Sequence, residues 1–402
     1  MLGQHADLVN DATAERGSVR TDETELRRFT AGELERRRAA LDALAAEACV
    51  DHLLLYGANR SAGPVTWLSQ WPVTREAALV RTPGERDVLL VSFYNHVPAA
   101  ARLAPELDVR YGGPSCVAAA VGLLLERGAA GAGVGVVGAV PWQAARRFDA
   151  LGRAVDLSGE YARLRRVKSP EEVACLRAAA ELTDASAQAL VERLAPGVSE
   201  HELAAAVEGA YLPRGGTNHI HYVSVTSMAE PDRCVPSQWP TSREVQAGDV
   251  VTFELSTSLV PDYPGQLLRT TTVGAGPTPL YRRLHEVAEQ ALDAVLARLH
   301  PGTPASELVA ASSVVEQEGF TTVDDLVHGF GGGYLAPVLG TRSRTLEPVP
   351  DLLLEAGMTL VVRPNVATPD LRSGVQVGEL VLVTPGGPER LHRFPRGLRR
   401  VG

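Results

Sequence analysis

The 402-residue sequence has only four cysteines, no long basic run and no long apolar stretch. The cysteines lie far apart and form no CxxC pair, which argues against a zinc site or a disulfide framework and predicts free thiols in a reducing compartment. A formal net charge of -9 argues against nucleic acid or an anionic membrane as the main partner. No apolar run approaches the roughly 18 residues of a membrane span, and the polar N-terminus lacks the apolar core of a signal peptide, so we expect a cytoplasmic protein.

The composition is that of a globular protein with enough apolar material for a sizeable core. Hydrophobic residues make up 45% of the chain and charged residues 22%. This balance is ordinary for folded domains, and the chain length favours two of them.

The first half predicts a small α/β domain over residues 29–162, preceded by a polar arm over residues 1–28. Thr30 and Glu33 form a capping-box pattern ahead of helical spacing. Short apolar runs predict strands at His52–Tyr56, Ala77–Val80 and Val88–Phe93. The glycine-rich run 133–138 is interpreted as a buried strand, because such a run alone is weak evidence for a dinucleotide-binding loop.

Residues 163–402 predict a second domain of α+β type. Ser169, Pro170 and Glu172 supply an N-cap, a proline at the first helical position and an N3 carboxylate, and Ser199 begins a second capping box. Further helices are expected near residues 280–299 and 304–318, and strands at Val250–Glu254, Leu268–Val273, Thr359–Val362 and Glu379–Val383. Helices packed on an antiparallel sheet give an α+β layout.

Five short segments of the second half follow one another in a distinctive order. They are Gly248–Glu254, Gly265–Thr270, His328–Gly331, Gly357–Pro364 and Gly378–Thr384. Their order and spacing resemble the catalytic domain of the creatinase/aminopeptidase P/prolidase family, which has the pita-bread fold. The segment Arg163–Glu172 resembles the family's junction between lid and catalytic domains. The resemblance implies an α+β protein with a small creatinase-like α/β lid over residues 29–162, a pita-bread catalytic domain over residues 163–402, and a homodimer.

The resemblance also implies a metal-binding framework that has lost most of its ligands. Metal-using members carry Asp, Asp, His, Glu and Glu in five positions, which here hold Glu254, Gln266, His328, Arg363 and Gly378. Divalent ions need several oxygen ligands, and a permanent cation opposes them. Glu379 comes one residue after the last position, so on a strand it should face the other side. We therefore expect no metal and no cofactor.

Histidine chemistry is the remaining catalytic option. Creatinase, a metal-free member, uses a histidine, but the corresponding position here lies near Ser237. His328, in a glycine-dense segment, is one candidate for the acid/base, with Glu254 orienting it or activating water. His219 and His221, expected on one face of a strand, are the others, and their alternative interpretation is a structural or surface role.

Other residues are candidates for binding the substrate. Arg363 is expected to pair with Glu254 and to hold a substrate carboxylate. The remaining candidates are Gln266, Tyr334 and, by resemblance to lids that reach the partner's active site, Trp71 and Arg75. Tyr334 and Trp71 are as readily explained by packing.

The sequence therefore predicts a metal-independent, creatinase-like enzyme. It would hydrolyse a C–N or amide bond in a small anionic nitrogen-containing substrate, using histidine as the acid/base and arginine as the carboxylate clamp. The alternatives are a non-hydrolytic lyase, isomerase or cyclase in the same pocket, or a non-catalytic peptide-binding pseudo-peptidase. An open pocket in which Arg363, Glu254 and His328 converge would favour an enzyme, and a filled one would favour the binding protein.

Overall fold

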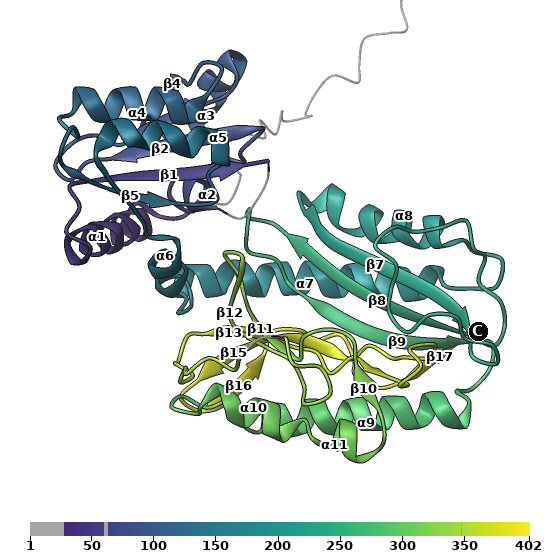
Figure 1. The fold of residues 1–402 in the computed structure, drawn as a ribbon. Coiled ribbons are helices and arrows are strands. Elements are labelled where there is room, and N and C mark those ends of the chain that lie inside the picture. Colours follow the sequence, from purple (N-terminus) through teal and green to yellow (C-terminus); the bar gives the residue numbers. More distant parts are fainter. Residues whose placement is uncertain (1–27, 60–62, 347) are drawn as a thin grey trace, which may run out of the picture.

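The computed structural model describes residues 28–59, 63–346 and 348–402, which form two parts, each with its own sheet (Figure 1). The N-terminal part has a six-stranded sheet in the order β4-β3-β2-β1-β5-β6. Its strands are β1 (His52–Ala58), β2 (Glu76–Arg81), β3 (Val88–Val91), β4 (Asp108–Tyr111), β5 (Gly133–Val137) and β6 (Arg153–Asp156). The predicted polar arm lies outside the described residues except for Arg28.

Helices cover both faces of this first sheet (Figure 1). They are α1 (Ala31–Glu47), α2 (Pro64–Ser69), α3 (Val97–Leu103), α4 (Cys116–Glu126), α5 (Trp142–Ala145) and α6 (Ser158–Leu164). The glycine-rich run is strand β5, paired in parallel with β1 and β6. A Cβ at Gly135 would lie only 2.4 Å from Leu157 Cδ1 and 2.7 Å from Leu53 Cδ2, so glycine here permits close packing. The interpretation of this run as a buried strand is confirmed.

The second part is built on a larger sheet with the strand order β12-β11-β13-β15-β9-β8-β7. Its strands are β7 (Thr217–Ser227), β8 (Asp249–Ser258), β9 (Leu267–Val273), β11 (Val327–Phe330), β12 (Tyr334–Leu339), β13 (Thr359–Val362) and β15 (Gly378–Thr384). Strand β16 (Gly387–Arg390) pairs with β15, β17 (Arg399–Val401) pairs with β9, and β10 (Thr321–Thr322) pairs with β14 (Val366–Ala367). The strands predicted from the apolar runs are all present: most are longer than predicted, whereas β13 has the predicted bounds and β3 ends at Val91 instead of Phe93.

Helices flank this sheet on opposite sides (Figure 1). They are α7 (Pro170–Arg193) and α8 (Glu200–Tyr211) on one side, and α9 (Pro279–Leu296), α10 (Ala305–Ala311) and α11 (Val314–Gln317) on the other. Along β15, Leu380 and Leu382 pack in the cluster that contains α7, whereas Val381 and Val383 pack in the cluster that contains α9. This period-2 division is what a strand buried on both faces requires.

Two observations on the helices complete the comparison with the sequence. The single helix expected over residues 304–318 is divided into α10 and α11, because Ser312 leaves helical geometry and its hydroxyl donates to the carbonyl of Val309. Within the described ranges, no helix is both long enough and apolar enough to cross a membrane.

The start of α7 joins the two parts through a buried carboxylate. Ser169 caps the helix and forms the predicted capping box with Glu172. Glu172 also accepts hydrogen bonds from Arg37 at 3.0 Å, from the Trp67 indole at 3.2 Å and from the Tyr263 hydroxyl. Because Arg37 and Trp67 belong to the N-terminal part, one helix N-terminus fixes the lid against the second part.

We predict that Ser169→Ala lowers the free energy of unfolding by about 1 kcal/mol or more, because it removes the cap and releases the carboxylate that anchors the lid. Ser199→Ala is the matched control, since Ser199 is half-buried and forms the same capping box on α8 with an exposed capping hydrogen bond. Denaturant unfolding of both variants measures the difference. A smaller loss for Ser169→Ala than for Ser199→Ala would contradict the anchoring role.

Candidate functional site

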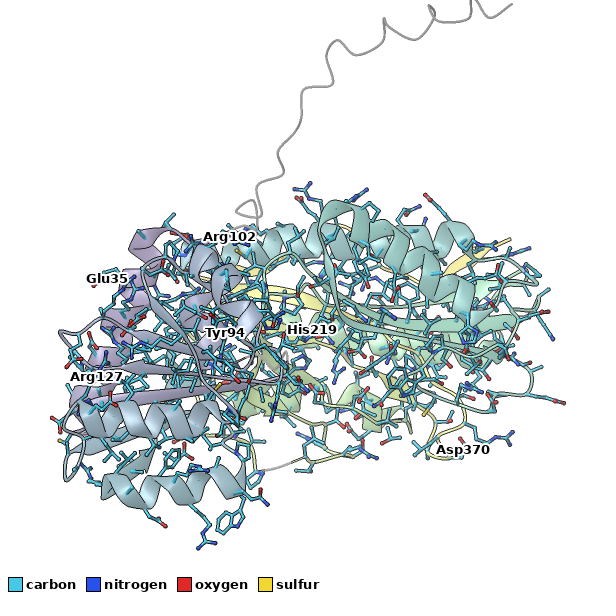
Figure 2. The ribbon with its side chains drawn as sticks, turned by 90° about the horizontal axis from the view of Figure 1, so that it is seen from above. Glu35, Tyr94, Arg102, Arg127, His219 and Asp370 are labelled. Carbon is cyan, nitrogen blue, oxygen red and sulfur yellow. The ribbon has the colours of Figure 1, made fainter. Side chains whose placement is uncertain are left out.

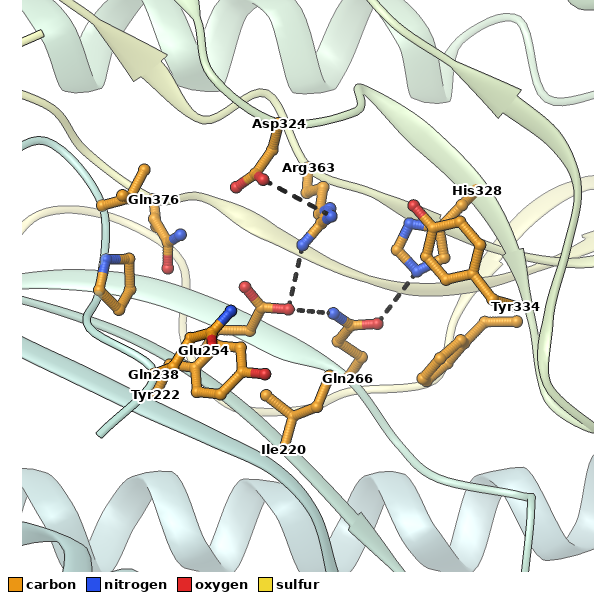
Figure 3. A pocket seen from close by; sticks show the side chains of 13 residues that line it. Ile220, Tyr222, Gln238, Glu254, Gln266, Asp324, His328, Tyr334, Arg363 and Gln376 are labelled. Carbon is orange, nitrogen blue, oxygen red and sulfur yellow. Dashed lines mark hydrogen bonds and ion pairs between the residues drawn. The ribbon is translucent and has the colours of Figure 1, made fainter. Parts of the chain in front are cut away.

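A cavity of about 270 Å³ lies in the second part, where β8, β11 and the ends of β9 and β13 approach one another (Figure 3). Its polar lining comprises Glu254, Gln266, Asp324, His328, Arg363 and Gln376, with Tyr222, Gln238 and Tyr334 beside them. Its apolar lining comprises Ile220, Val235, Pro236 and Phe330. Five of the site residues predicted on separate segments are therefore brought to one cavity: Glu254, Gln266, His328, Tyr334 and Arg363.

Five side chains form a closed ring of hydrogen bonds at this cavity, and Figure 3 shows the part of it that joins Arg363, Glu254, Gln266 and His328. Arg363 Nη1 donates to Glu254 Oε1 at 3.0 Å, and Gln266 Nε2 donates to the same oxygen. Gln266 Oε1 lies 3.2 Å from His328 Nε2, and His328 Nδ1 lies 2.6 Å from Asp325 Oδ2. Arg363 Nη2 donates to Asp325 Oδ1 and closes the ring. The predicted pairing of Arg363 with Glu254 is confirmed.

Donor and acceptor rules limit where the protons of this ring lie. An ionised Glu254 only accepts, so Gln266 turns its NH₂ group to it and its oxygen to His328. Both ring nitrogens of His328 must then donate, one to Gln266 and one to the ionised Asp325, and the imidazole is charged. If Glu254 is protonated, the amide can reverse and His328 can be neutral. Both states have the same net charge, so Glu254 and His328 share one proton.

Burial and neighbouring charges shift the protonation of the ring. Burial raises the pKa of Glu254, although Arg363 acts in the opposite direction. Burial lowers the pKa of His328, although the hydrogen bond that His328 donates to Asp325 acts in the opposite direction. For Asp325, burial alone would raise the pKa, but His328 and Arg363 hold it well below the usual range. These directions move Glu254 and His328 each towards the neutral form, while Asp325 stays ionised as the partner of Arg363.

Access to the ring differs sharply among its members. His328 is only 1% exposed, both its nitrogens are engaged, and Tyr334 stacks on it at 4.2 Å between ring centroids. Glu254 binds its two partners through Oε1, and within the described chain Oε2 has no hydrogen-bond partner (Figure 3). The group best placed to meet a ligand directly is therefore Glu254.

Asp325 is the ring member that the sequence analysis missed. It lies three residues before His328 in the loop that enters β11 and is 5% exposed. Its position is not one of the five that the resemblance singles out. The available signal was the Asp324–Asp325 pair directly before an apolar segment, a place where a buried carboxylate needs a cationic partner.

Gly378, the last position of the framework, and Glu379, the residue after it, lie as expected on opposite sides of β15. A Cβ added at Gly378 would come within 2.7 Å of both Arg363 Cβ and the Val362 carbonyl oxygen, so the glycine makes room for the arginine. Glu379 binds Arg269 Nη2 at 3.1 Å and also Arg390, away from the cavity. A change of register that would bring Glu379 into the site is therefore opposed by two ion pairs, of which the one with Arg269 is fully buried.

The expectation that His219 and His221 share one strand face is wrong. The pairing of β7 with β8 shifts by one residue between Asn218 and Ile220, a β-bulge that leaves His219 as the extra residue. His221 Nε2 lies 3.4 Å from Glu208 of α8. His219 is exposed (Figure 2) and lies with its ring 5.6 Å from that of Phe330, a residue of the cavity wall. Neither histidine is among the lining residues.

The two lid candidates lie outside this cavity. Trp71 is 8% exposed and belongs to the apolar core of the N-terminal part. Arg75 is exposed and has a positive φ of 65°, with its backbone N–H donating to Asn59 Oδ1. A contribution of either to the site of a partner copy stays a prediction.

Comparison with known proteins identifies the family. A model of metallopeptidase family M24 matches residues 174–385, which is more than half of the chain. The chain belongs to metallopeptidase family M24. The predicted family and the pita-bread fold are thereby confirmed.

The proteins that this chain resembles include dipeptidases. The chain is 26% identical over 237 residues to the Xaa-Pro dipeptidase of Pyrococcus furiosus, and the match covers 58% of this chain and 65% of the relative. The chain thus spans just under two thirds of that relative's length. Its fold is similar to that of dipeptidase PepE from Mycobacterium ulcerans, with a TM-score of 0.77, 23% identity and coverage of 93% of this chain and 100% of that chain. The prolidase from Pyrococcus furiosus gives a TM-score of 0.72 and 19% identity, covering 88% of this chain and 99% of that one.

The donor set of the cavity does not suit the two divalent ions that the M24 framework implies. Two bridged ions need several carboxylates around them, but the Arg363 guanidinium already binds Glu254 and Asp325. Gln266 offers a neutral oxygen that faces His328, and Gly378 offers no ligand. Across residues 28–59, 63–346 and 348–402, no group of three or more His, Cys, Asp and Glu side chains is arranged to hold a metal ion.

We predict that Asp325→Asn lowers the free energy of unfolding by about 3 kcal/mol, because it leaves a buried guanidinium with a single carboxylate partner. Asp149→Asn, at an exposed position of the lid, is the control and should change stability by less than about 0.5 kcal/mol. Denaturant unfolding measures both. Equal stability of Asp325→Asn and the wild type would show that the ring does not stabilise the fold.

Proposed function

We propose that this M24 protein is a metal-independent hydrolase of a C–N or amide bond in a small nitrogen-containing substrate. The observation that carries the proposal is the position of the Arg363 guanidinium, bonded to Glu254 and Asp325 at a cavity of about 270 Å³. A fixed cation in that place supplies the positive charge that carboxylates around it require. The cavity remains open beside these groups, which favours an enzyme over a filled, purely structural site.

Glu254 is the proposed acid/base. In its ionised form, Oε2 takes a proton from a water molecule while the water oxygen forms a bond to the carbonyl carbon of the substrate. The C–N bond then breaks, its electron pair stays on nitrogen, and Glu254 returns the proton to the leaving amine. Arg363 Nε, which has no partner in the described chain, is the available N–H donor for the oxygen that becomes negative.

His328 and Gln266 are proposed as positioning residues rather than as the groups that touch the substrate. Gln266 holds Glu254 Oε1, and His328 holds Gln266. Because His328 is stacked under Tyr334 and bonded through both nitrogens, it acts on Glu254 through the amide. This assignment moves the acid/base from the histidine favoured by the sequence to the glutamate beside it.

The carboxylate clamp expected of Arg363 loses its basis in this geometry. Both terminal nitrogens of the guanidinium are hydrogen-bonded to protein carboxylates. A third carboxylate, that of Asp324, lies with Oδ1 at 4.0 Å from Nη2. Only Nε remains for a ligand, so the bidentate binding that recognises a carboxylate is not available. We therefore do not propose that the substrate is anionic, as the sequence led us to expect.

We predict that the purified protein holds no stoichiometric metal, before or after incubation with Mn²⁺, Zn²⁺, Fe²⁺ or Co²⁺, because Arg363 repels divalent ions. Elemental mass spectrometry measures the content. The double variant Gln266→Asp/Arg363→Glu removes the cation, adds two carboxylates beside Glu254 and is expected to take up metal. Tightly held metal in the wild type, with activity lost on chelation, would contradict the proposal of a metal-independent enzyme.

We predict that Glu254→Gln lowers kcat about 10²–10⁴-fold on the best substrate found among small carboxamides, since a neutral amide cannot accept the proton. Tyr222→Phe, a change at another lining residue, is the control. In the wild type the base must be ionised, so kcat should fall as the pH decreases through a pKa raised above the ordinary glutamate range by burial.

Other outcomes of this experiment point to the alternatives. Turnover without release of amine or ammonia, still lost in Glu254→Gln, indicates a lyase, isomerase or cyclase that uses the same base. Binding of small amides or peptides that Glu254→Gln leaves unchanged, with no turnover, indicates a non-catalytic binding protein.

A further inference from the structure

The charge at the cavity is unbalanced towards the negative side. Glu254 and Asp325 bind the one guanidinium of Arg363 directly, whereas Asp324 Oδ1 lies at its edge, 4.0 Å from Nη2 (Figure 3). Asp324 lines the cavity with its side chain 35% exposed, and Oδ2 accepts a hydrogen bond from Asn365 Nδ2 at 3.1 Å. A carboxylate held in this way at a cavity wall attracts a ligand cation.

Gln376 has a side-chain amide that forms no hydrogen bond within the described residues. Its backbone is fixed by Thr270, whose hydroxyl accepts from the Gln376 N–H at 2.8 Å and donates to the Gln376 carbonyl at 2.9 Å. The residue is 0% exposed and lines the cavity, yet within the described residues neither Oε1 nor Nε2 has a hydrogen-bond partner. Figure 3 shows its amide on the side of the cavity where Asp324 and the free oxygen of Glu254 lie. A buried amide left unsatisfied is costly unless a ligand completes it.

We infer that the cavity binds a small α-amino carboxamide, with its protonated amine towards Asp324 and its carboxamide paired with the amide of Gln376. An amide is the group that offers a donor and an acceptor side by side, as Gln376 does. The apolar wall of Ile220, Val235 and Phe330 then receives an aliphatic side chain. This inference rests on the proposed function, because it names the substrate class of the same cavity.

The chemistry of the cavity discriminates against the corresponding free acid. A carboxylate only accepts hydrogen bonds, so it leaves Gln376 Oε1 unpaired. It also brings a further negative charge beside Asp324 and Glu254. An N-acylated amide keeps the carboxamide but has no ammonium group for Asp324. Three related ligands therefore separate the two recognition elements.

Isothermal titration calorimetry of the full chain with leucinamide, leucine and N-acetyl-leucinamide tests the inference. Leucinamide should bind, and each of the other two should bind about 10-fold more weakly or worse. Leucine binding as tightly as leucinamide would overturn the role of the carboxamide. Equal binding of N-acetyl-leucinamide would overturn the role of the amine, and no binding of leucinamide would overturn the whole inference.

Two variants assign the discrimination to the residues named. Gln376→Met keeps the side-chain length and should reduce the difference in affinity between leucinamide and leucine. Asp324→Asn should reduce the difference in affinity between leucinamide and N-acetyl-leucinamide. Glu47→Gln, at an exposed position of α1, is the charge control and should leave all three affinities unchanged. If both site variants fold and the ratios of the three affinities stay as in the wild type, the inference is contradicted. If one variant fails to fold, the other variant and the three-ligand comparison with the wild type test the inference.

Release of ammonia from leucinamide is measured separately from binding. Selective binding without ammonia release leaves the ligand class standing and counts against hydrolysis. Ammonia release from other amides without binding of leucinamide supports hydrolysis and overturns the ligand class.

Discussion

The contact on which the site depends is the Arg363 guanidinium between Glu254 and Asp325. Glu254 of β8, Asp325 before β11 and Arg363 after β13 meet at this point, and the two carboxylates cannot be buried together without a cation. A guanidinium suits the place because its planar donors meet two carboxylates at once and it keeps its charge at all relevant pH. Burial acts to lower the pKa of Arg363, but Glu254 and Asp325 outweigh that effect and raise it.

The surrounding backbone fits that contact. Gly378 has no side chain where a Cβ would meet Arg363 and the Val362 carbonyl, and Glu379 turns to Arg269 and Arg390 on the other side of β15. The arginine and the glycine are thus two halves of one arrangement, because restoring a side chain at position 378 would require the backbone of β13 and β15 to separate. A metal site cannot be regained in this scaffold by one substitution at either position alone.

The sequence predicted the scaffold better than the chemistry. Capping boxes at Ser169 and Ser199 and apolar runs such as Thr359–Val362 depend on neighbours in the chain, and the structure has them where expected. The ring instead joins residues separated by 38, 62 and 109 positions, and Asp325 enters it only because the chain folds back on Arg363. At His219, a single extra residue in β7 overrides strict alternation, and no local signal in the sequence marks that bulge.

A closed ring also decides which groups are left to react. His328 uses both nitrogens and Gln266 both amide atoms inside the ring, so the histidine that the sequence singles out is held rather than free. Among the lining residues that the structure describes, Arg363 Nε and both amide atoms of Gln376 lack a hydrogen-bond partner, and Glu254 Oε2 takes no part in the ring. Because an unsatisfied buried group gains most from a ligand, substrate specificity in this M24 protein should depend on Glu254, Arg363 and Gln376, and Gln376 lies outside the five framework positions.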